Sequence, residues 1–104
     1  MLNTVKFEGN IKNITVRGTE QRNVVTATVS QYAGVSPTGQ PRCNAFVNVV
    51  AFSDKAKAML NALMDIQERM PSVIIEGQLS YYRAKDDSVR QQVIVESVSL
   101  VESV

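Results

Sequence analysis

Apolar and polar residues alternate strictly near the start of the chain. From residue 5 to residue 12, every odd position is apolar or glycine and every even position is polar. A period of two predicts a strand that buries one face. Gly9 within this stretch indicates a bulge or a bend, because glycine removes the side chain where two backbones come close.

The same alternation predicts two more strands, at residues 24–32 and 43–52. Between the first two strands, residues 17–23 are polar and include Gly18, which predicts a turn. Residues 33–42 carry two glycines and two prolines. They predict a flexible loop or a loose hairpin, because proline is excluded from central strands.

A helical pattern follows, from Asp54 to about Met70. Ser53 or Asp54 is suited to cap its first turn by accepting a backbone N–H bond. Pro71 ends the pattern, because proline disfavours a helical residue before itself. One apolar stripe repeats at i, i+3 and i+4; it comprises Ala56, Met59, Leu60, Leu63, Ile66 and Met70.

Two strands complete the pattern, at residues 73–82 and 89–101, with a polar hairpin tip at residues 83–87 between them. Gly77 interrupts the first of these strands. In the second, the alternation that begins at Val89 changes near Glu96 and Ser97. Because side chains alternate between faces, this change predicts a slip of register there.

The predicted order is three strands, one helix and two strands, without internal repeats. An all-β fold of five strands with a helix between the third and the fourth is the plan of the OB-fold, a partly open Greek-key barrel. An open α+β sheet with the helix on one face is the alternative. The barrel is preferred because the strands are long, and because Gly9 and Gly77 lie where a strongly coiled strand must bend. We therefore expect residues 1–104 to form a single OB-fold domain.

Composition agrees with one ordinary globular domain and narrows the chemistry. The 104 residues are 44% hydrophobic and 20% charged, with no His, no Trp and a single Cys at position 43. Without His, the commonest general base and metal ligand is missing. One Cys builds neither a disulfide framework nor a zinc site. We therefore expect no metal and no cofactor, and Cys43 suits a reducing cytosol.

The formal net charge of +1 gives no global attraction to nucleic acid or membrane, so any anion-binding surface must be local. No apolar stretch has the length of a signal-peptide core or a membrane span. We expect a cytoplasmic protein without a membrane partner, associated with the nucleoid or, if it comes from a phage, present in the host cytoplasm.

An enzymatic function is disfavoured. Acidic and basic residues are interspersed along the helical segment, which is typical of a solvated helix face; they are Asp54, Lys55, Lys57, Asp65, Glu68 and Arg69. The sequence has neither a glycine-rich phosphate loop nor a recognisable nucleophile–base pair. These features indicate a binding protein.

The strand at residues 43–52 carries large apolar side chains on both faces. One face contains Val47, Val49 and Ala51, and the other contains Phe46 and Phe52. A half-solvated strand is polar on its outer side. Three explanations compete: both faces belong to the core, the outer face meets another subunit, or the rings form a platform on which bases stack. Composition alone favours the core, because Phe is commonly buried.

Aromatic and basic residues meet again at the end of the fourth predicted strand. Tyr81 and Tyr82 are adjacent, so one of them faces outward in either register. Three cations follow, at Arg83, Lys85 and Arg90. Aromatic faces for bases and cations for phosphates are what single-strand binding requires. A plain solvated turn is the alternative, because two neighbouring Asp residues dilute the charge.

Three short motifs resemble those of the bacterial single-stranded DNA-binding protein family, in the same order and at compatible spacing. The first is FEGNI at residues 7–11, followed by VR at residues 16–17. The second is VVAF at residues 49–52, directly before the helix. The third and most telling is IIEGQL at residues 74–79. The resemblance covers residues 4–101.

The resemblance implies an OB-fold, usually assembled as a homotetramer, that wraps single-stranded DNA in replication, recombination and repair. It also implies stacking rings: Phe52 matches the family's third-strand Phe, and Phe46 matches an upstream Trp or other aromatic. Tyr32 lies near a frequent Trp, and Tyr82 is the ring closest to the family's fourth-strand aromatic. Together with the fourth-strand tip, the candidate nucleic-acid-binding residues are Lys6, Lys12, Arg17, Tyr32, Arg42, Phe46, Phe52, Tyr81, Tyr82, Arg83, Lys85 and Arg90.

Two departures from the family pattern matter. Cellular members usually continue into a Gly/Pro/Gln-rich linker and an acidic tip that recruits repair proteins, whereas this sequence stops at Val104 after the last predicted strand. We therefore expect no acidic tail, as in a member from a phage or mobile element or in a truncated chain. The absence of Trp means that stacking depends on Phe and Tyr.

Two functions from different classes follow. The first is sequence-independent binding and protection of single-stranded DNA by base stacking and by Lys and Arg contacts to phosphates. The second is an OB-fold protein-interaction module of a replication assembly, of the primosomal replication protein N type. Expected partners are single-stranded DNA, further copies of the chain in a dimer or tetramer, and replication or recombination proteins. The choice between DNA and RNA stays open, because stacking and backbone grooves accept either.

Overall fold

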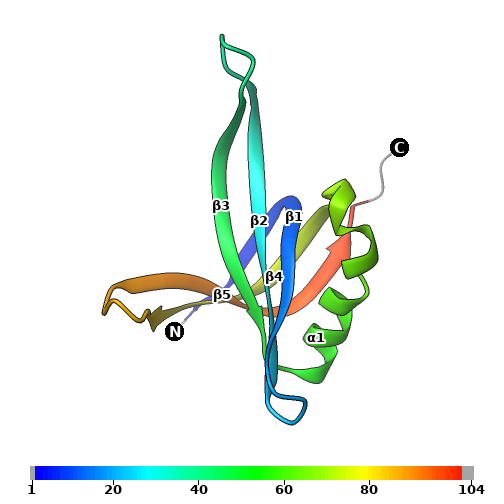
Figure 1. Ribbon diagram of the computed structural model, residues 1–104, viewed down its shortest axis with the longest axis vertical. Helices are drawn as coiled ribbons and strands as arrows, with labels where there is room; N and C mark the ends of the chain where they lie inside the picture. Colours follow the sequence, from blue (N-terminus) through cyan, green and yellow to red (C-terminus); the bar gives the residue numbers. More distant parts are fainter. Residues whose placement is uncertain (1, 102–104) are drawn as a thin grey trace.

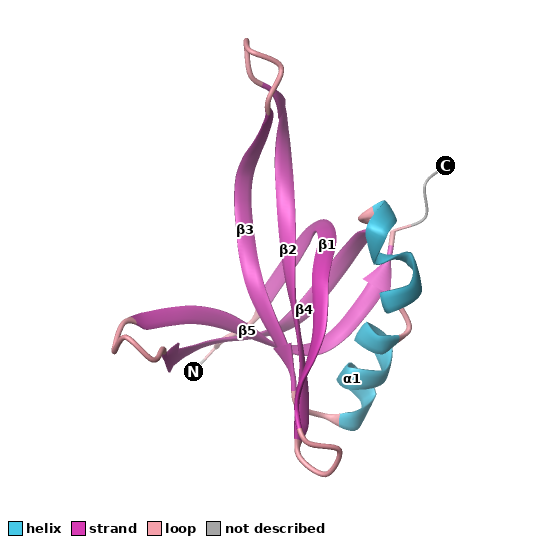
Figure 2. Cartoon of the chain, in the orientation of Figure 1, coloured by secondary structure: helices cyan, strands magenta, loops and turns pink. Residues whose placement is uncertain are grey.

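The computed structural model describes residues 2–101, and their side chains except at positions 33, 41, 43 and 44. The expectations for the Cys43 thiol and for the end of the chain lie outside this description. Five strands and two short helical segments follow one another (Figures 1 and 2); they are β1 (Val5–Gly18), β2 (Asn23–Val35), β3 (Pro41–Ala51), α1 (Asp54–Asn61), η1 (Met64–Arg69), β4 (Ser72–Arg83) and β5 (Val89–Leu100).

The strands form a closed barrel in the order β1-β2-β3-β5-β4. β1 closes it by pairing antiparallel with β4 from residue 5 to 10 and with β2 from residue 10 to 18. β3 and β5 are parallel and share only two rungs, Val49 with Val93 and Val50 with Ile94. This is the predicted five-stranded OB-fold, and the open-sheet alternative is wrong.

Inward-facing side chains fill the barrel, and α1 covers it on the side away from the β4–β5 hairpin (Figure 2). Ser53 caps α1 as predicted, because its hydroxyl accepts the Ala56 N–H at 3.2 Å. Neither helical segment within residues 2–101 is long and apolar enough to cross a membrane. The core comprises Ile11, Ile14, Val25, Ala27, Val29, Val49, Ala51, Ala56, Leu60, Leu63, Val73, Ile75, Val93 and Val95.

Two glycines permit close strand approaches, as predicted. A Cβ on Gly9 would lie 2.6 Å from the carbonyl oxygen of Ser30, and one on Gly77 would overlap the carbonyl oxygen of Ile94. The predicted slip in the last strand is also confirmed. Glu76 pairs with Ser97 and Gly77 with Val95, so Glu96 is the extra residue of a bulge.

The single helix predicted from residue 54 to 70 is wrong in its second half. The α-helix ends at Asn61, and a 3-10 segment, η1, follows from Met64 to Arg69. Apolar residues at 60, 63 and 66 recur every three positions. That spacing satisfies both an α-helical stripe and the three-residue turn of a 3-10 helix, so the pattern could not separate them.

Of the two alternatives for residues 33–42, the hairpin is confirmed and the flexible loop is wrong, although the strands extend further than predicted. β2 continues to Val35 and β3 begins at Pro41, so only residues 36–40 form the turn. Pro41 pairs with Val35 at the last rung, where a missing N–H breaks nothing further along the ladder. The hairpin of β2 and β3 and the hairpin of β4 and β5 both project from the barrel as arms (Figure 1). We call residues 31–45 the β2–β3 arm and residues 79–92 the β4–β5 arm.

Candidate nucleic-acid interface

Cross-strand register aligns outward side chains into rows over β1, β2 and β3. One row joins Lys12, Thr28 and Asn48, and the Thr28 hydroxyl donates to Asn48 Oδ1 at 3.3 Å. The next row places Phe46 opposite Ser30. We call this surface the outer face; it comprises Asn10, Lys12, Thr15, Arg17, Val24, Thr26, Thr28, Phe46, Asn48 and Phe52, whereas Ser30 is buried beneath it.

The two Phe residues of the outer face are exposed. Phe46 is 62% and Phe52 51% accessible, although both are large apolar rings. Val50, between them on the same side, is buried because β5 pairs beside it. The interpretation that both faces of this strand belong to the core is therefore wrong for the rings within the single chain. A subunit contact and a stacking platform are the explanations that remain.

A long groove runs along the outer face and continues onto the β4–β5 arm. Its volume is about 850 Å³. Two cations and two rings from distant parts of the sequence line it, namely Arg17, Phe52, Tyr82 and Arg90. The rest of the lining is mainly polar, with Asn13, Thr15, Thr26, Thr28, Asn48 and Gln92. The groove thus combines aromatic surface, cations and hydrogen-bonding groups.

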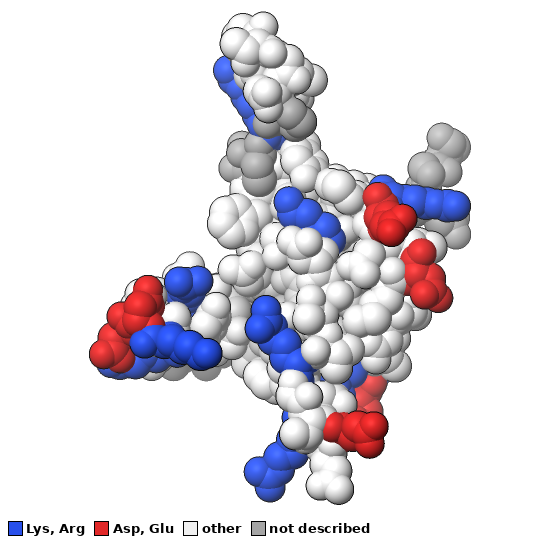
Figure 3. All heavy atoms as spheres, viewed as in Figure 1, with Lys and Arg blue, Asp and Glu red and all other residues white. Residues whose placement is uncertain are grey.

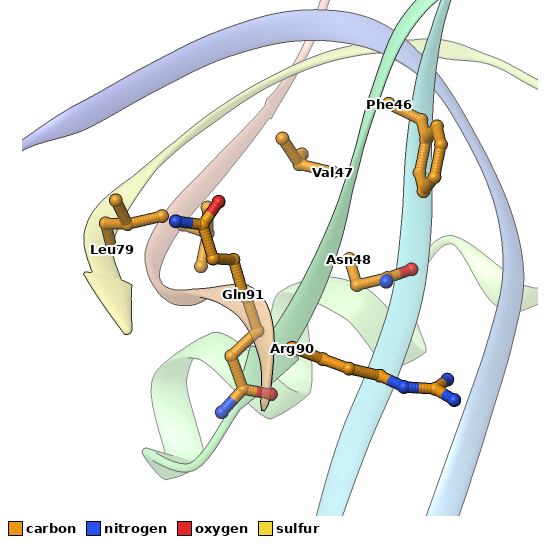
Figure 4. A pocket seen from close by; sticks show the side chains of 8 residues that line it. Phe46, Val47, Asn48, Leu79, Arg90 and Gln91 are labelled. Atoms are coloured by element: carbon orange, nitrogen blue, oxygen red, sulfur yellow. The ribbon is translucent and has the colours of Figure 1, made fainter. Parts of the chain in front are cut away.

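A second hollow, the notch, opens where β3 and β5 diverge before their two shared rungs (Figure 4). Its volume is about 490 Å³. Figure 4 shows Arg90 directed across β3 on the side of Phe46 and Asn48, whereas Gln91 extends toward Leu79. The complete lining is Phe46, Val47, Asn48, Leu79, Arg90, Gln91, Gln92 and Val93. Asn48, Arg90 and Gln92 line both hollows, so the notch and the long groove are direct neighbours.

Strand register distinguishes the two adjacent tyrosines. Tyr82 pairs with Arg90 and lines the long groove. Tyr81 pairs with Gln91 on the opposite side of the hairpin and is 72% exposed, outside both hollows. Tyr32, also exposed, lies two residues after Ser30 and therefore on the side of β2 that carries the Phe46 row.

The bulge in β1 shapes the floor of the groove. Asn13 and Ile14 together stand opposite Ala27, and Asn13 adopts a left-handed φ of 57°. The Ile14 N–H donates to Gln67 Oε1 of η1 at 2.9 Å. This bond satisfies the backbone N–H of Ile14, which has no partner on β2 because of the bulge. Asn13 and Thr15 consequently line the groove on either side of the buried Ile14.

Acidic residues accompany two cations of the β4–β5 arm. Arg90 Nη2 lies 3.9 Å from Asp86 Oδ2, and Arg83 Nη1 lies 3.9 Å from Asp87 Oδ1. The hydroxyl and backbone N–H of Ser88 donate to Asp86 and, with a smaller contribution from Arg90, lower the pKa of Asp86 from its ordinary value. Such loose, exposed ion pairs contribute little free energy, so the Arg90 guanidinium remains available to an anion.

The other basic residues among the sequence-based candidates are dispersed over the surface. Lys6 lies on the β1–β4 side, with its Nζ 3.4 Å from Glu76 Oε1. Arg42 is on the β2–β3 arm, and Arg83 and Lys85 are at the end of the other arm; all three are exposed. Lys12 is half-buried on the outer face. None of these five lines either hollow. In the view of Figure 3, basic side chains lie across the middle of the molecule, and acidic ones lie at the tip of the β4–β5 arm and on the helix side.

Polar residues that line the groove were absent from the candidate set. Asn13, Thr15, Asn48 and Gln92 come from three strands, and only pairing register brings them together. The sequence did indicate that Thr26 and Thr28 face outward, since they form the polar face of their predicted strand. Among the described residues, no group of three or more His, Cys, Asp or Glu side chains is arranged to hold a metal ion.

Comparison with known proteins identifies the fold. No protein-family model matches the sequence, and no curated protein matches it. The small single-stranded DNA-binding protein of Streptomyces coelicolor is similar in structure, with a TM-score of 0.68 at 14% identity over 97% of this chain and 95% of that chain. A small single-stranded DNA-binding protein from Mycoplasma pneumoniae gives 0.64 at 17% identity, over 95% and 93% of the two chains.

A third structure was solved with a nucleic acid. The Plasmodium falciparum SSB in complex with single-stranded DNA gives a TM-score of 0.61 at 11% identity, over 98% of this chain and 96% of that chain. The present chain therefore has the OB-fold of these single-stranded DNA-binding proteins over nearly its whole length.

Proposed function

We propose that the protein binds and protects single-stranded DNA, without requiring a particular sequence, along the long groove and the outer face. The observation that carries the proposal is the exposure of Phe46 and Phe52 on one side of β3, beside a groove lined by Arg17 and Arg90. Two large rings that are more than half exposed contribute little to the core of the single chain. Flat apolar rings next to cations match the faces and phosphates of unpaired nucleotides.

Stacking supplies most of the binding free energy in this proposal. A base that stacks on an aromatic ring contributes about 1–3 kcal/mol, and every base has a suitable face. Phe46 and Phe52 are the principal platforms, and Tyr82 extends the aromatic surface onto the β4–β5 arm. Tyr32 extends it along β2, two residues from the Phe46 row. A nearly neutral chain can therefore bind a polyanion if its few cations lie along the same path.

Arg17 and Arg90 are the proposed phosphate contacts. We expect Arg90→Ala to weaken binding to a dT oligomer and to reduce the slope of log Kd against log salt by about 0.7, the value for one phosphate contact on a single strand. A salt series of fluorescence-anisotropy titrations measures this slope.

Lys55→Ala is the matched control for that series, since Lys55 is an exposed cation on α1 that lines neither hollow. Its slope should equal that of the wild type. Equal slopes for all three proteins would show that Arg90 makes no phosphate contact.

The proposal extends to cellular role and assembly. A binder of this kind acts in DNA replication, recombination and repair, in the cytoplasm on the nucleoid or on phage DNA, and performs no catalysis itself.

We also propose that it forms a homo-oligomer, a dimer or a tetramer. Three apolar side chains outside both hollows, Val16, Val35 and Leu100, are about half exposed or more, at 46%, 68% and 53%. Contacts between copies would cover such residues.

A further inference from the structure

The notch differs chemically from the outer face beside it. Its floor is made by Val47, Leu79 and Val93, which face the barrel side of β3, β4 and β5. Val93 is buried, but Leu79 is 46% exposed because it lies two residues beyond the last rung between β1 and β4, Val5 with Gly77. The floor is therefore apolar surface that continues the core and opens to solvent.

Leu79 is held firmly at the back of this floor. The Asn3 side-chain amide donates to the Leu79 carbonyl oxygen and accepts its N–H, both at 3.0 Å. One carboxamide thus replaces the neighbouring strand that β1 no longer supplies at this position, since their ladder ends at Gly77. These two hydrogen bonds hold the Leu79 backbone in place at the back of the notch.

Carboxamides form most of the rim. Asn48, Gln91 and Gln92 each offer a donor and an acceptor, and Arg90 is the one charged residue among the described lining. No carboxylate lines the hollow within residues 2–101. An aliphatic ligand would leave the amides without partners, which is costly. A planar heterocycle fits both the apolar floor and the carboxamide rim, because its faces are apolar and its edge carries donors and acceptors.

We propose that the notch takes up one nucleobase turned out of the strand that lies in the long groove. This inference rests on the proposed function and adds a second mode of base contact to it. The base enters edge first between β3 and β5, contacts Leu79 and Val47, and meets the Gln91 amide with its hydrogen-bonding edge. Its phosphate lies at Arg90, which lines both hollows. The volume of about 490 Å³ is within the range of small-molecule sites.

The geometry of β3 explains why the two modes are neighbours. Phe46 and Val47 are adjacent in sequence and face opposite sides of the strand. A nucleotide stacked on Phe46 therefore has the next base at the edge of β3 that opens into the notch. Since an amide hydrogen-bonds differently to each base edge, the notch gives the protein a base preference at one position of an otherwise unselective path.

The test compares variants that change the notch with one that does not. Leu79→Ala should weaken binding to a dT oligomer by about fivefold, through lost apolar contact. Gln91→Ala should change the ratio of Kd values for dC and dT oligomers by about threefold, as expected for one altered hydrogen bond. Val89→Ala is the control, since Val89 is 61% exposed on the same side of the arm but outside the notch. It should change neither quantity.

Methyl NMR of the wild type supplies a second readout that needs no variant. Addition of the dT oligomer should shift the Leu79 and Val47 methyl signals, through the ring current of the inserted base, and leave those of Val89 in place. If Leu79→Ala and Gln91→Ala match Val89→Ala and these methyl signals stay unmoved, the notch is empty in the complex and the inference is wrong. A loss of affinity in Phe46→Ala under those conditions would still support the proposed function. If the wild type does not bind the oligomer, both fail together.

Discussion

Phe46→Ala should lower the affinity for single-stranded DNA by about five- to 150-fold, which corresponds to the 1–3 kcal/mol of one base stacked on one ring. The melting temperature should change little, because the ring is 62% exposed and contributes little to the core. Phe52→Ala should behave similarly. The double variant should lose close to the sum of both free energies, since five residues of extended chain separate the two rings.

Titration with a dT oligomer at fixed salt, together with thermal melting of the same samples, measures both quantities. Val89→Ala is a suitable control, because Val89 is similarly exposed at 61% but lies outside both hollows. It should leave the affinity unchanged. Unchanged affinity in Phe46→Ala with a collapsed melting temperature would assign the ring a structural role and contradict the stacking platform.

Gly77→Ala should produce the largest loss of stability. The added Cβ would overlap the carbonyl oxygen of Ile94, and backbone on the neighbouring strand cannot rotate away as a side chain can. Forced overpacking of this kind costs about 3 kcal/mol or more. We therefore expect the melting temperature to fall by at least about 12 °C for a domain of this size. Differential scanning calorimetry measures the change.

Gly39→Ala is the control that distinguishes the cost of this clash from the backbone cost of replacing a glycine that has a positive φ. Gly39 has a positive φ of 86°, but a Cβ there would meet no atom within 4 Å. Its cost should be about 1 kcal/mol, the typical penalty for a non-glycine residue in such backbone. If Gly77→Ala proves no more damaging than Gly39→Ala, the close approach of β4 and β5 at this position does not exist.

Local pattern sufficed to locate the strands, because the buried face of each strand is set by its own alternation. Alternation located all five strands, and the glycines at positions 9 and 77 marked the two close approaches. The bulge at Glu96 was visible as a change of alternation in a single strand. The division of the helical region was not visible, because α1 and η1 share an apolar spacing that fits both helix types.

The candidate site depended on contacts that no local pattern contains. Arg17 on β1 and Tyr82 on β4 are far apart in sequence, and only the pairing of the strands brings both to the lining of one groove. Which of the two adjacent tyrosines faces the groove is set by the pairing of Tyr82 with Arg90. Lys6 was a candidate for the same reason as Arg17, its positive charge, yet its strand pairing places it beside Glu76. Residue type selected candidates, and register decided between them.

The most direct test of the central proposal is a titration of the wild type with single-stranded and duplex DNA of equal length at the same salt concentration. In a duplex the bases stack on one another and cannot reach Phe46 or Phe52, and a net charge of +1 offers little general attraction to the backbone. We expect the single strand to bind at least about tenfold more tightly, as the loss of one to two stacked bases requires. Equal affinity for the two DNAs would contradict binding through the exposed rings.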